Sequence, residues 1–191
     1  RSYGSGTVVR HVIDSTYVMT AAHVCWSPKI DTKTLGHKTI TVKVSTNIIV
    51  TDGHGRNFQS EIYAMDPKND ICILRSSGIF GEPIPIAKNP PELPERVYTY
   101  GAPLAIHHPG VILLFSGFTS GTLRQQDRLV NFYTLVARPG SSGSSVLNHK
   151  GEIVGLIHTA ITKLESVAIG SSLKSIQTIV NSIPEVTYER V

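Results

Sequence analysis

Short apolar segments separated by turn residues recur along the whole chain, and most of them have the length of a β-strand. Residues 39–45 alternate cleanly, with Ile40, Val42 and Val44 on one face and polar side chains on the other. A period of two is typical of a strand with one buried face. Similar segments predict further strands in the first half of the chain, over residues 6–12, 17–20, 47–51, 58–65 and 71–74.

The second half of the chain repeats this rhythm and changes period only at its end. Leu173, Ile176, Val180 and Ile183 recur at helical spacing. They follow two serines, at 171–172, that can cap the first turn of a helix. The pattern therefore predicts one terminal helix, preceded by strands over residues 97–100, 111–118, 129–136, 145–147, 153–159 and 167–169.

A proline-rich segment separates the two halves. Residues 87–96 read AKNPPELPER, and prolines at this density exclude a central strand or the interior of a helix. We therefore expect an N-terminal β unit over residues 1–86, a linker over 87–96, and a C-terminal β unit with the helix over 97–191. Many short strands with frequent turns favour an all-β barrel or sandwich architecture.

Composition narrows the function classes. The chain has 191 residues, of which 40% are hydrophobic and 17% charged, so it can bury a core without metals or a disulfide framework. No apolar stretch approaches the roughly 18 residues of a membrane span. The net charge of +4 comes from scattered Lys and Arg residues, and nucleic acid is therefore not an expected partner.

Three polar residues have the chemistry of nucleophilic catalysis. A serine hydroxyl is a weak nucleophile that needs an adjacent base, and histidine suits this role because its pKa lies near neutral pH. A carboxylate must then fix the tautomer of the histidine. The candidates are Ser142 as nucleophile, His23 as base and Asp70 as the orienting acid. The main-chain N–H groups of Gly140 and Ser142 would form the oxyanion hole.

The order of these residues separates fold families. An α/β-hydrolase runs serine, acid, histidine, with its serine in a G-x-S-x-G segment. Here the order is histidine, acid, serine, and Ser144 breaks the G-x-S-x-G pattern. Asp66 and Asp52 are the substitutes should Asp70 not be the acid.

Several segments, in the same order along the chain, resemble the chymotrypsin-like (trypsin-fold) serine proteases, and the HtrA/Deg-like and viral 3C-like branches in particular. They are GSGTVV at 4–9, TAAH at 20–23, DICIL at 70–74, YGAPL at 100–104, FSGFTSG at 115–121, PGSSGSS at 139–145 and the strand at 151–160. The resemblance implies two six-stranded antiparallel β-barrels with a C-terminal helix. It also implies a serine endopeptidase that acts on polypeptides through an acyl-enzyme.

The resemblance also implies where the side chain before the scissile bond would bind. Its pocket, S1, is expected between two segments that contribute Val136, Ala137, Ile157, His158, Thr159 and Ala160. In an ungapped register Ile157 faces S1 and favours a hydrophobic P1 residue. A one-residue bulge would turn His158 into the pocket and favour Gln or Glu.

Several alternatives stay open from the sequence. A pseudoprotease that binds peptides without cutting them is the second hypothesis for function. Cys25 and Cys72 are expected as two reduced core thiols, which weakly favours a reducing compartment, and a disulfide between them is the alternative. No metal or cofactor is implied, and the oligomeric state is undetermined.

Overall fold

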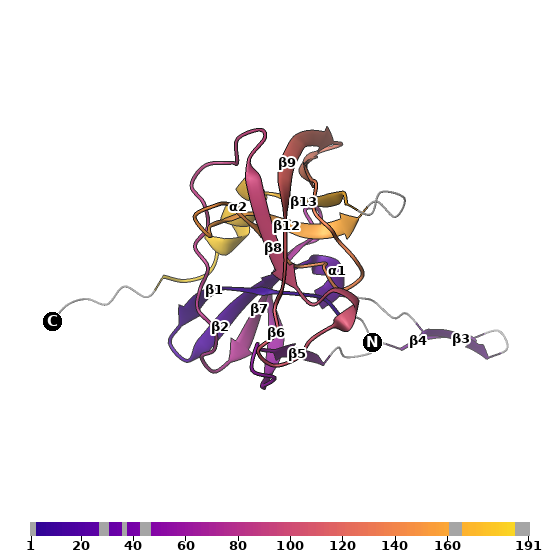
Figure 1. Cartoon of the computed structure of the whole chain (residues 1–191). Helices are drawn as coiled ribbons and strands as arrows, with labels where there is room; N and C mark the ends of the chain where they lie inside the picture. The colour runs from indigo at the N-terminus through magenta and orange to yellow at the C-terminus, as the bar shows by residue number, and fades with distance from the viewer. Residues whose placement is uncertain (1–2, 27–30, 36–37, 43–46, 161–165, 186–191) are drawn as a thin grey trace.

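Strands are the main regular elements of the computed structural model, which describes residues 3–26, 31–35, 38–42, 47–160 and 166–185 (Figure 1). The first-half strands are β1 (Thr7–Val12), β2 (Ser15–Thr20), β3 (Asp31–Leu35), β4 (Lys38–Val42), β5 (Ile48–Thr51), β6 (Asn57–Asp66) and β7 (Ile71–Ser77). The second-half strands are β8 (Arg96–Gly101), β9 (Leu113–Gln125), β10 (Arg128–Tyr133), β11 (Ser145–Leu147), β12 (Ile153–Ala160) and β13 (Ala168–Ser172). The helical elements are α1 (Ala22–Cys25), the 3₁₀ turn η1 (Pro103–Ala105) and α2 (Leu173–Val180).

Five of the first-half strands form an open antiparallel sheet in the order β1-β2-β7-β6-β5, and β3 pairs with β4 in a separate two-stranded sheet. The central strands of the five-stranded sheet are β2, which is buried along its whole length, and β7, whose residues 71–74 are buried. The described residues of the first half therefore form an open sheet and not the six-stranded barrel that was expected. The alternating segment at 39–45 contributes β4, whose described partner is β3, and residues 43–45 lie outside the described part. A period of two predicts a strand but does not identify its partner.

The second-half strands close into a six-stranded barrel, as expected, in the order β10-β13-β12-β11-β8-β9. Its core contains the fully buried side chains of Tyr133, Leu135, Val97 and Val146. Strand β9 extends well beyond the predicted 111–118, because it continues into a long hairpin with β10. The fold as a whole is mostly β with a terminal helix, as the sequence predicted.

Helix α2 joins the two halves. Ser172 caps it by accepting a hydrogen bond from the main-chain N–H of Ser175 at 3.4 Å. Its buried face, at Ile176 and Ile179, packs in one core cluster with Met19 and Ile71 of the first sheet, and with Ile153 and Leu156 of the barrel. One apolar core therefore continues from the sheet through α2 into the barrel. Within the described residues, no helix is long and apolar enough to cross a membrane.

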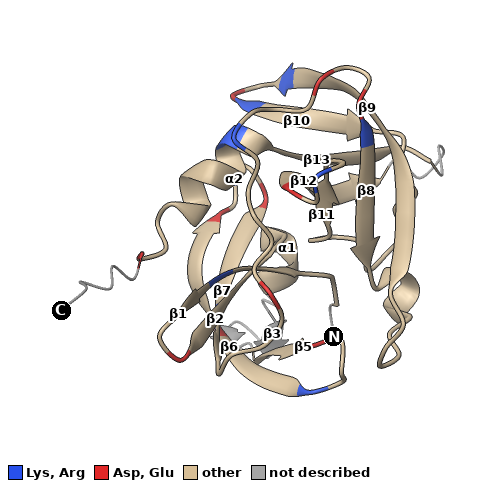
Figure 2. Ribbon diagram, turned by 60° about the vertical axis from the view of Figure 1, so that its left-hand side comes forward, with Lys and Arg blue, Asp and Glu red and all other residues tan. Residues whose placement is uncertain are grey.

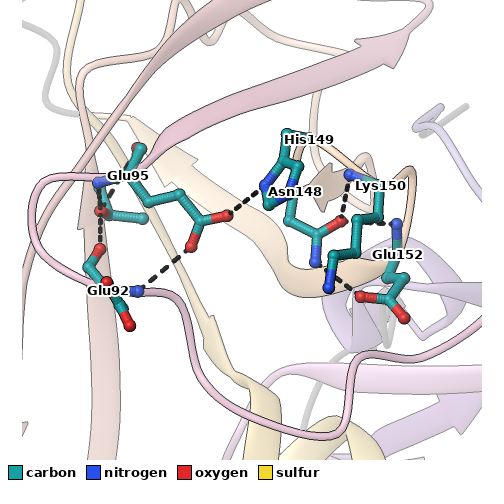
Figure 3. A network of polar contacts seen from close by, with 7 residues as sticks. Glu92, Glu95, Asn148, His149, Lys150 and Glu152 are labelled. Carbon is teal, nitrogen blue, oxygen red and sulfur yellow. Dashed lines mark hydrogen bonds and ion pairs between the residues drawn. The ribbon is translucent and has the colours of Figure 1, made fainter.

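The segment between the halves is held by polar contacts at its end (Figure 3). The carboxylate of Glu95 accepts the main-chain N–H of Glu92 at 3.1 Å and contacts the ring of His149 at 3.2 Å. Asn148 accepts main-chain N–H groups of Lys150 and Glu152, both at 2.9 Å. The end of the proline-rich segment is thus fastened to the β11–β12 turn. Its last residue, at 96, begins β8 and was predicted as linker.

Charged side chains are distributed over both halves. Figure 2 shows Lys and Arg on several elements, interspersed with Asp and Glu, rather than along one strand or helix.

Candidate active site

His23 projects from a single helical turn at the end of the buried strand β2. Its ring Nδ1 lies 2.8 Å from Asp70 Oδ2, and its main-chain N–H donates to Asp70 Oδ1 at 2.9 Å. The side chain is 49% exposed. The two contacts fix one tautomer, with Nδ1 as the donor. The turn itself, α1, was not predicted from the sequence.

Asp70 is presented by a tight turn between β6 and β7. Asp66 holds this turn by accepting the main-chain N–H of Asn69 at 3.0 Å. Asp70 itself has a φ of 55°, in the left-handed region that Asp tolerates better than most residues. From the barrel, Ser171 donates its hydroxyl proton to the carbonyl of Asn69 at 2.5 Å. The turn is therefore anchored from both halves of the molecule.

The two alternative acids are engaged elsewhere. Asp66 is committed to its turn, as described above. Asp52 forms an ion pair with Arg56 at 2.6 Å and accepts two main-chain N–H groups of its own turn. Asp70 is the one of the three that contacts the ring of His23.

The pairing shifts both pKa values. The pKa of His23 is raised above its ordinary 6.5, mainly because the ring donates a hydrogen bond to Asp70; partial burial opposes the rise and the charge of Asp70 adds to it. Burial would raise the pKa of Asp70, but the hydrogen bonds from His23 and the nearby imidazoles outweigh it and hold that pKa below its ordinary value. Near neutral pH, Asp70 is therefore ionised.

Ser142 lies in the loop before β11, next to the strand end that leads to His23. Its hydroxyl donates to the carbonyl of His158 at 3.4 Å, and its own carbonyl accepts the N–H of Ser5 at 2.8 Å. The following residue, Gly143, has a φ of 88°, and a Cβ there would lie 2.1 Å from the carbonyl oxygen of Ser5. Only glycine allows the loop to approach this closely.

Two main-chain N–H groups of the same loop are free. Within the described residues, the N–H groups of Gly140 and Ser142 donate no hydrogen bond. The carbonyl of Pro139 accepts the N–H of Leu104 at 2.6 Å. Because a trans peptide places its N–H opposite its C=O, the N–H of Gly140 is directed away from Leu104. Neither N–H group is therefore used in the described part of the structure.

Ser5 makes four contacts that the sequence did not predict. Its N–H donates to Ser142 and its carbonyl accepts the hydroxyl of Thr20 at 2.7 Å. Its hydroxyl donates to the carbonyl of Gly140 at 2.8 Å and accepts the N–H of Ala102 at 2.9 Å. Ser5 thus connects the serine loop, the end of β2 and the barrel. The GSG segment at 4–6 resembles the corresponding segment of the trypsin-fold proteases, but that resemblance does not predict a role for the Ser5 hydroxyl.

The residues expected around S1 are divided between core and surface. Ala137 and Ile157 are buried in the barrel core, and Ala160 packs partly against it. Val136 and Thr159 are exposed. His158 is buried and occupies a bulge, because β12 advances two residues, from Ile157 to Thr159, while β13 advances one. Its ring Nδ1 lies 4.0 Å from Asp70 Oδ2.

Cys25 and Cys72 form a disulfide, so the prediction of two reduced thiols was wrong. Strand pairing places Cys72 opposite Thr20 at the end of β2, and the one turn of α1 brings Cys25 back over it. Both residues are buried. The argument for a reducing compartment rested on free thiols and no longer has a basis. No group of three or more His, Cys, Asp or Glu side chains that could hold a metal is found in the described part of the chain.

The fold and the sequence identify the class of protein. The family model of the trypsin-like peptidase domain matches residues 4–156, and the chain belongs to that family. Proteins called serine protease HtrA-like, from the Staphylococcus aureus strains bovine RF122 / ET3-1 and USA300, are each 23% identical over 94% of this chain. The chain spans 23% of the length of these relatives.

Solved structures share the fold at low identity. The serine endoprotease from Yersinia pestis aligns with a TM-score of 0.71 and 21% identity, covering 95% of this chain and 57% of that one. The active form of the Rv3671c protease from M. tuberculosis aligns with a TM-score of 0.71 and 19% identity over 96% of this chain and 74% of its own. The inactive form of Rv3671c gives 0.69 and 18%, over 96% and 84%. The trypsin fold expected from the sequence is confirmed.

Replacing Ser5 with alanine tests its connecting role. The Ser5→Ala variant leaves the carbonyl of Gly140 and the N–H of Ala102 without their partner, and we expect a loss of about 1–2 kcal/mol in the free energy of unfolding. Urea denaturation measures this change. A matched Ser77→Ala variant removes an exposed hydroxyl whose contact is long, 3.5 Å, and should change stability little. Equal effects of both substitutions would contradict the assigned role of Ser5.

Removing the disulfide tests the link between the segments that carry His23 and Asp70. The bridge spans 47 residues, and loop-closure entropy predicts that a Cys25→Ser, Cys72→Ser double variant loses about 4 kcal/mol of stability. Denaturation of the oxidised wild type and of the double variant measures the difference. Mass spectrometry of the wild type after alkylation should detect no free thiol; two alkylated cysteines would show that the bridge does not form.

Proposed function

We propose that this chain is a serine endopeptidase in which Ser142 is the nucleophile, His23 the general base and Asp70 the orienting acid. The observation that carries the proposal is the contact of 2.8 Å between His23 Nδ1 and Asp70 Oδ2, beside a serine loop with two free N–H donors. A solvent-accessible imidazole held by a partly buried anion suits proton transfer from a serine. Membership of the trypsin-like peptidase family supports the same reaction.

We propose the following sequence of steps. His23 Nε2 accepts the proton of the Ser142 hydroxyl while the oxygen attacks the scissile carbonyl. The N–H groups of Gly140 and Ser142 stabilise the negative charge that develops on the carbonyl oxygen. His23 then returns the proton to the leaving amine, which departs and leaves an acyl-enzyme. A water molecule, deprotonated by His23, hydrolyses the ester and regenerates Ser142.

The proposed substrate is an extended polypeptide that pairs with β12. Strand β11 covers β12 only as far as Leu156, and the N–H and C=O of Ile157 bond to the serine loop. Beyond this point the β11 side of residues 158–160 carries no strand partner among the described residues. A peptide can add to such an edge by main-chain hydrogen bonds. Of the residues expected around S1, Ile157 lies in the barrel core, and the bulge at His158 brings its ring near Asp70. Val136 is exposed, and its apolar side chain supports an apolar P1 residue.

Labelling with a fluorophosphonate tests the nucleophile. We expect one covalent adduct on the wild-type protein by intact mass and none on Ser142→Ala, whose peptide hydrolysis should fall by about 10⁶ in kcat, as in the subtilisin case. Ser144→Ala is the matched control in the same loop and should still be labelled. An adduct that survives in Ser142→Ala would exclude this serine. A folded wild type without any adduct would favour a peptide-binding pseudoprotease.

The dependence of kcat/KM on pH tests the pairing of His23 with Asp70. His23 must be neutral to accept a proton, so activity is lost as the pH falls through its pKa. Because Asp70 raises that pKa, the midpoint of the acid limb should lie above 6.5. Asp70→Asn should lower kcat by roughly 10⁴.

Asp70→Asn should also move the midpoint of this acid limb to lower pH, because it removes the anion. A wild-type midpoint at or below 6.5, or a loss of less than tenfold in Asp70→Asn, would contradict the role of Asp70.

A further inference from the structure

A cavity of about 610 Å³ lies between the barrel, the segment that joins the two halves and the start of α2. Its walls come from β9 and β10, from the stretch 88–93 and from the stretch 172–177. Among the described residues, none that is assigned to catalysis or expected around S1 lines this cavity. Ligand sites in proteins typically have volumes of about 300–1,000 Å³. The cavity is therefore large enough for a small organic molecule.

The segment that joins the halves is tied down on both sides of this cavity. On one side Gln177 of α2 donates from Nε2 to the carbonyls of Ala87 at 2.8 Å and Lys88 at 3.2 Å. On the other side the hydroxyl of Thr119 in β9 donates to the carbonyl of Glu92 at 2.8 Å. The two prolines between these anchors have a fixed φ and no N–H. The wall that this segment forms therefore needs little ordering when a ligand binds.

The lining combines apolar side chains with positive charge. Leu129 and Phe132 of β10 are half-buried, and Leu93 is 64% exposed, so a ligand can still remove apolar surface from water here. Lys88 and Lys174 also line the cavity, and no Asp or Glu does so in the described part of the chain. Neither lysine ammonium group forms a hydrogen bond or an ion pair with the described residues. The cavity thus offers an apolar wall beside two unpaired cations.

The strand β10 has no free edge at the cavity. Its residues 131–133 pair with β9 on one side and with β13 on the other. An extended peptide adds to a strand whose edge is free. Recognition along this wall therefore depends on apolar contact and on charge, and a small molecule can supply both.

We propose that this cavity binds a small organic anion, whose apolar body contacts Leu93, Leu129 and Phe132 and whose carboxylate is held by Lys88 and Lys174. Hydrogen bonds between an ammonium group and a carboxylate are stronger than those between neutral groups. An uncharged ligand of the same shape lacks this attraction, and a cation is repelled by both lysines. The proposal is independent of the peptidase chemistry, because no residue of the candidate active site takes part.

The probe 4-phenylbutyrate joins a carboxylate to an apolar body and tests the proposal directly. In a titration of isotope-labelled protein followed by NMR, we expect one saturable set of shifts that includes the amide signals of Gly121, Lys174 and Gln177, which line the cavity. The matched compounds 4-phenylbutanol and 4-phenylbutylamine replace the carboxylate with a hydroxyl and an ammonium group. The alcohol should bind about tenfold more weakly, and the amine more weakly still.

Two outcomes of this titration would overturn the proposal. Equal affinity for the acid, the alcohol and the amine would show that the two lysines do not select an anion. Shifts confined to the loop that carries Ser142 would place the ligand in the candidate active site and not in this cavity.

Substitutions separate the charge from the apolar wall. The Lys88→Gln, Lys174→Gln double variant should bind 4-phenylbutyrate about tenfold more weakly and the alcohol as the wild type does. Its unfolding midpoint should not change, because neither ammonium group has a partner to lose. Lys150→Gln, at the exposed β11–β12 turn, is the matched control and should leave the Kd unchanged. An unchanged Kd in the double variant would contradict the assigned role of the lysines.

The apolar contact has its own pair of variants. Leu93→Ser should weaken binding of both the acid and the alcohol by about threefold to tenfold, because it removes apolar surface from the wall. Leu123→Ser changes an exposed leucine of β9 that does not line the cavity, and should leave both affinities unchanged. Equal effects of the two substitutions would show that Leu93 does not contact the ligand.

A polypeptide that ends in an apolar residue presents the same two chemical features as a small organic acid. The tripeptide Gly-Gly-Phe with a free carboxylate distinguishes the two sources. It should bind more weakly than 4-phenylbutyrate, because its main-chain polar groups lose water against the apolar wall without gaining partners. Tighter binding of the tripeptide would overturn the assignment to a small molecule.

Discussion

The candidate site depends on the hydrogen bonds that Ser5 makes across the boundary between the two halves of the molecule. The base and the acid belong to the first sheet, and the serine belongs to the barrel, so no single element can align them. Ser5 binds the end of β2 through Thr20, the serine loop through Gly140 and Ser142, and the barrel through Ala102. A residue outside every regular element thus sets the separation of the two parts of the site.

Beneath these polar contacts, a continuous apolar core keeps the two halves from moving apart. Helix α2 packs Ile176 and Ile179 against residues of β2 and β7 on one side and of β12 on the other. The first sheet is open and gains its covering from the barrel and the helix. Fully buried side chains at this junction, such as Met19, Ile71 and Ile153, stabilise the arrangement by removing apolar surface from water.

Asp70 is the charged group that acts on the pKa values of both nearby histidines. Its position is held by a turn that Asp66 closes and Ser171 anchors, and the Cys25–Cys72 bridge ties the following strand to the turn that carries His23. The Asp70 carboxylate affects the pKa values of the two nearby imidazoles unequally. His23 is half exposed and hydrogen-bonded to it, whereas His158 is buried and farther away. The hydrogen bond to Asp70 raises the pKa of His23, whereas burial, with smaller contributions from Arg128 and His23, lowers the pKa of His158.

The sequence by itself determined the strands other than β3, the terminal helix, the order of the candidate residues and the family. Periodicity and short motifs are local properties, and they identified His23, Asp70, Ser142 and Gly140 as candidates. Only the tertiary structure decided the disulfide, the open first sheet, the connecting role of Ser5 and the bulge that turns His158 toward Asp70. These features are contacts between residues far apart in the chain, such as Ser5 and Gly140, which are 135 residues apart. Local patterns do not encode such contacts, because strand register and the packing of the two halves decide which distant atoms meet.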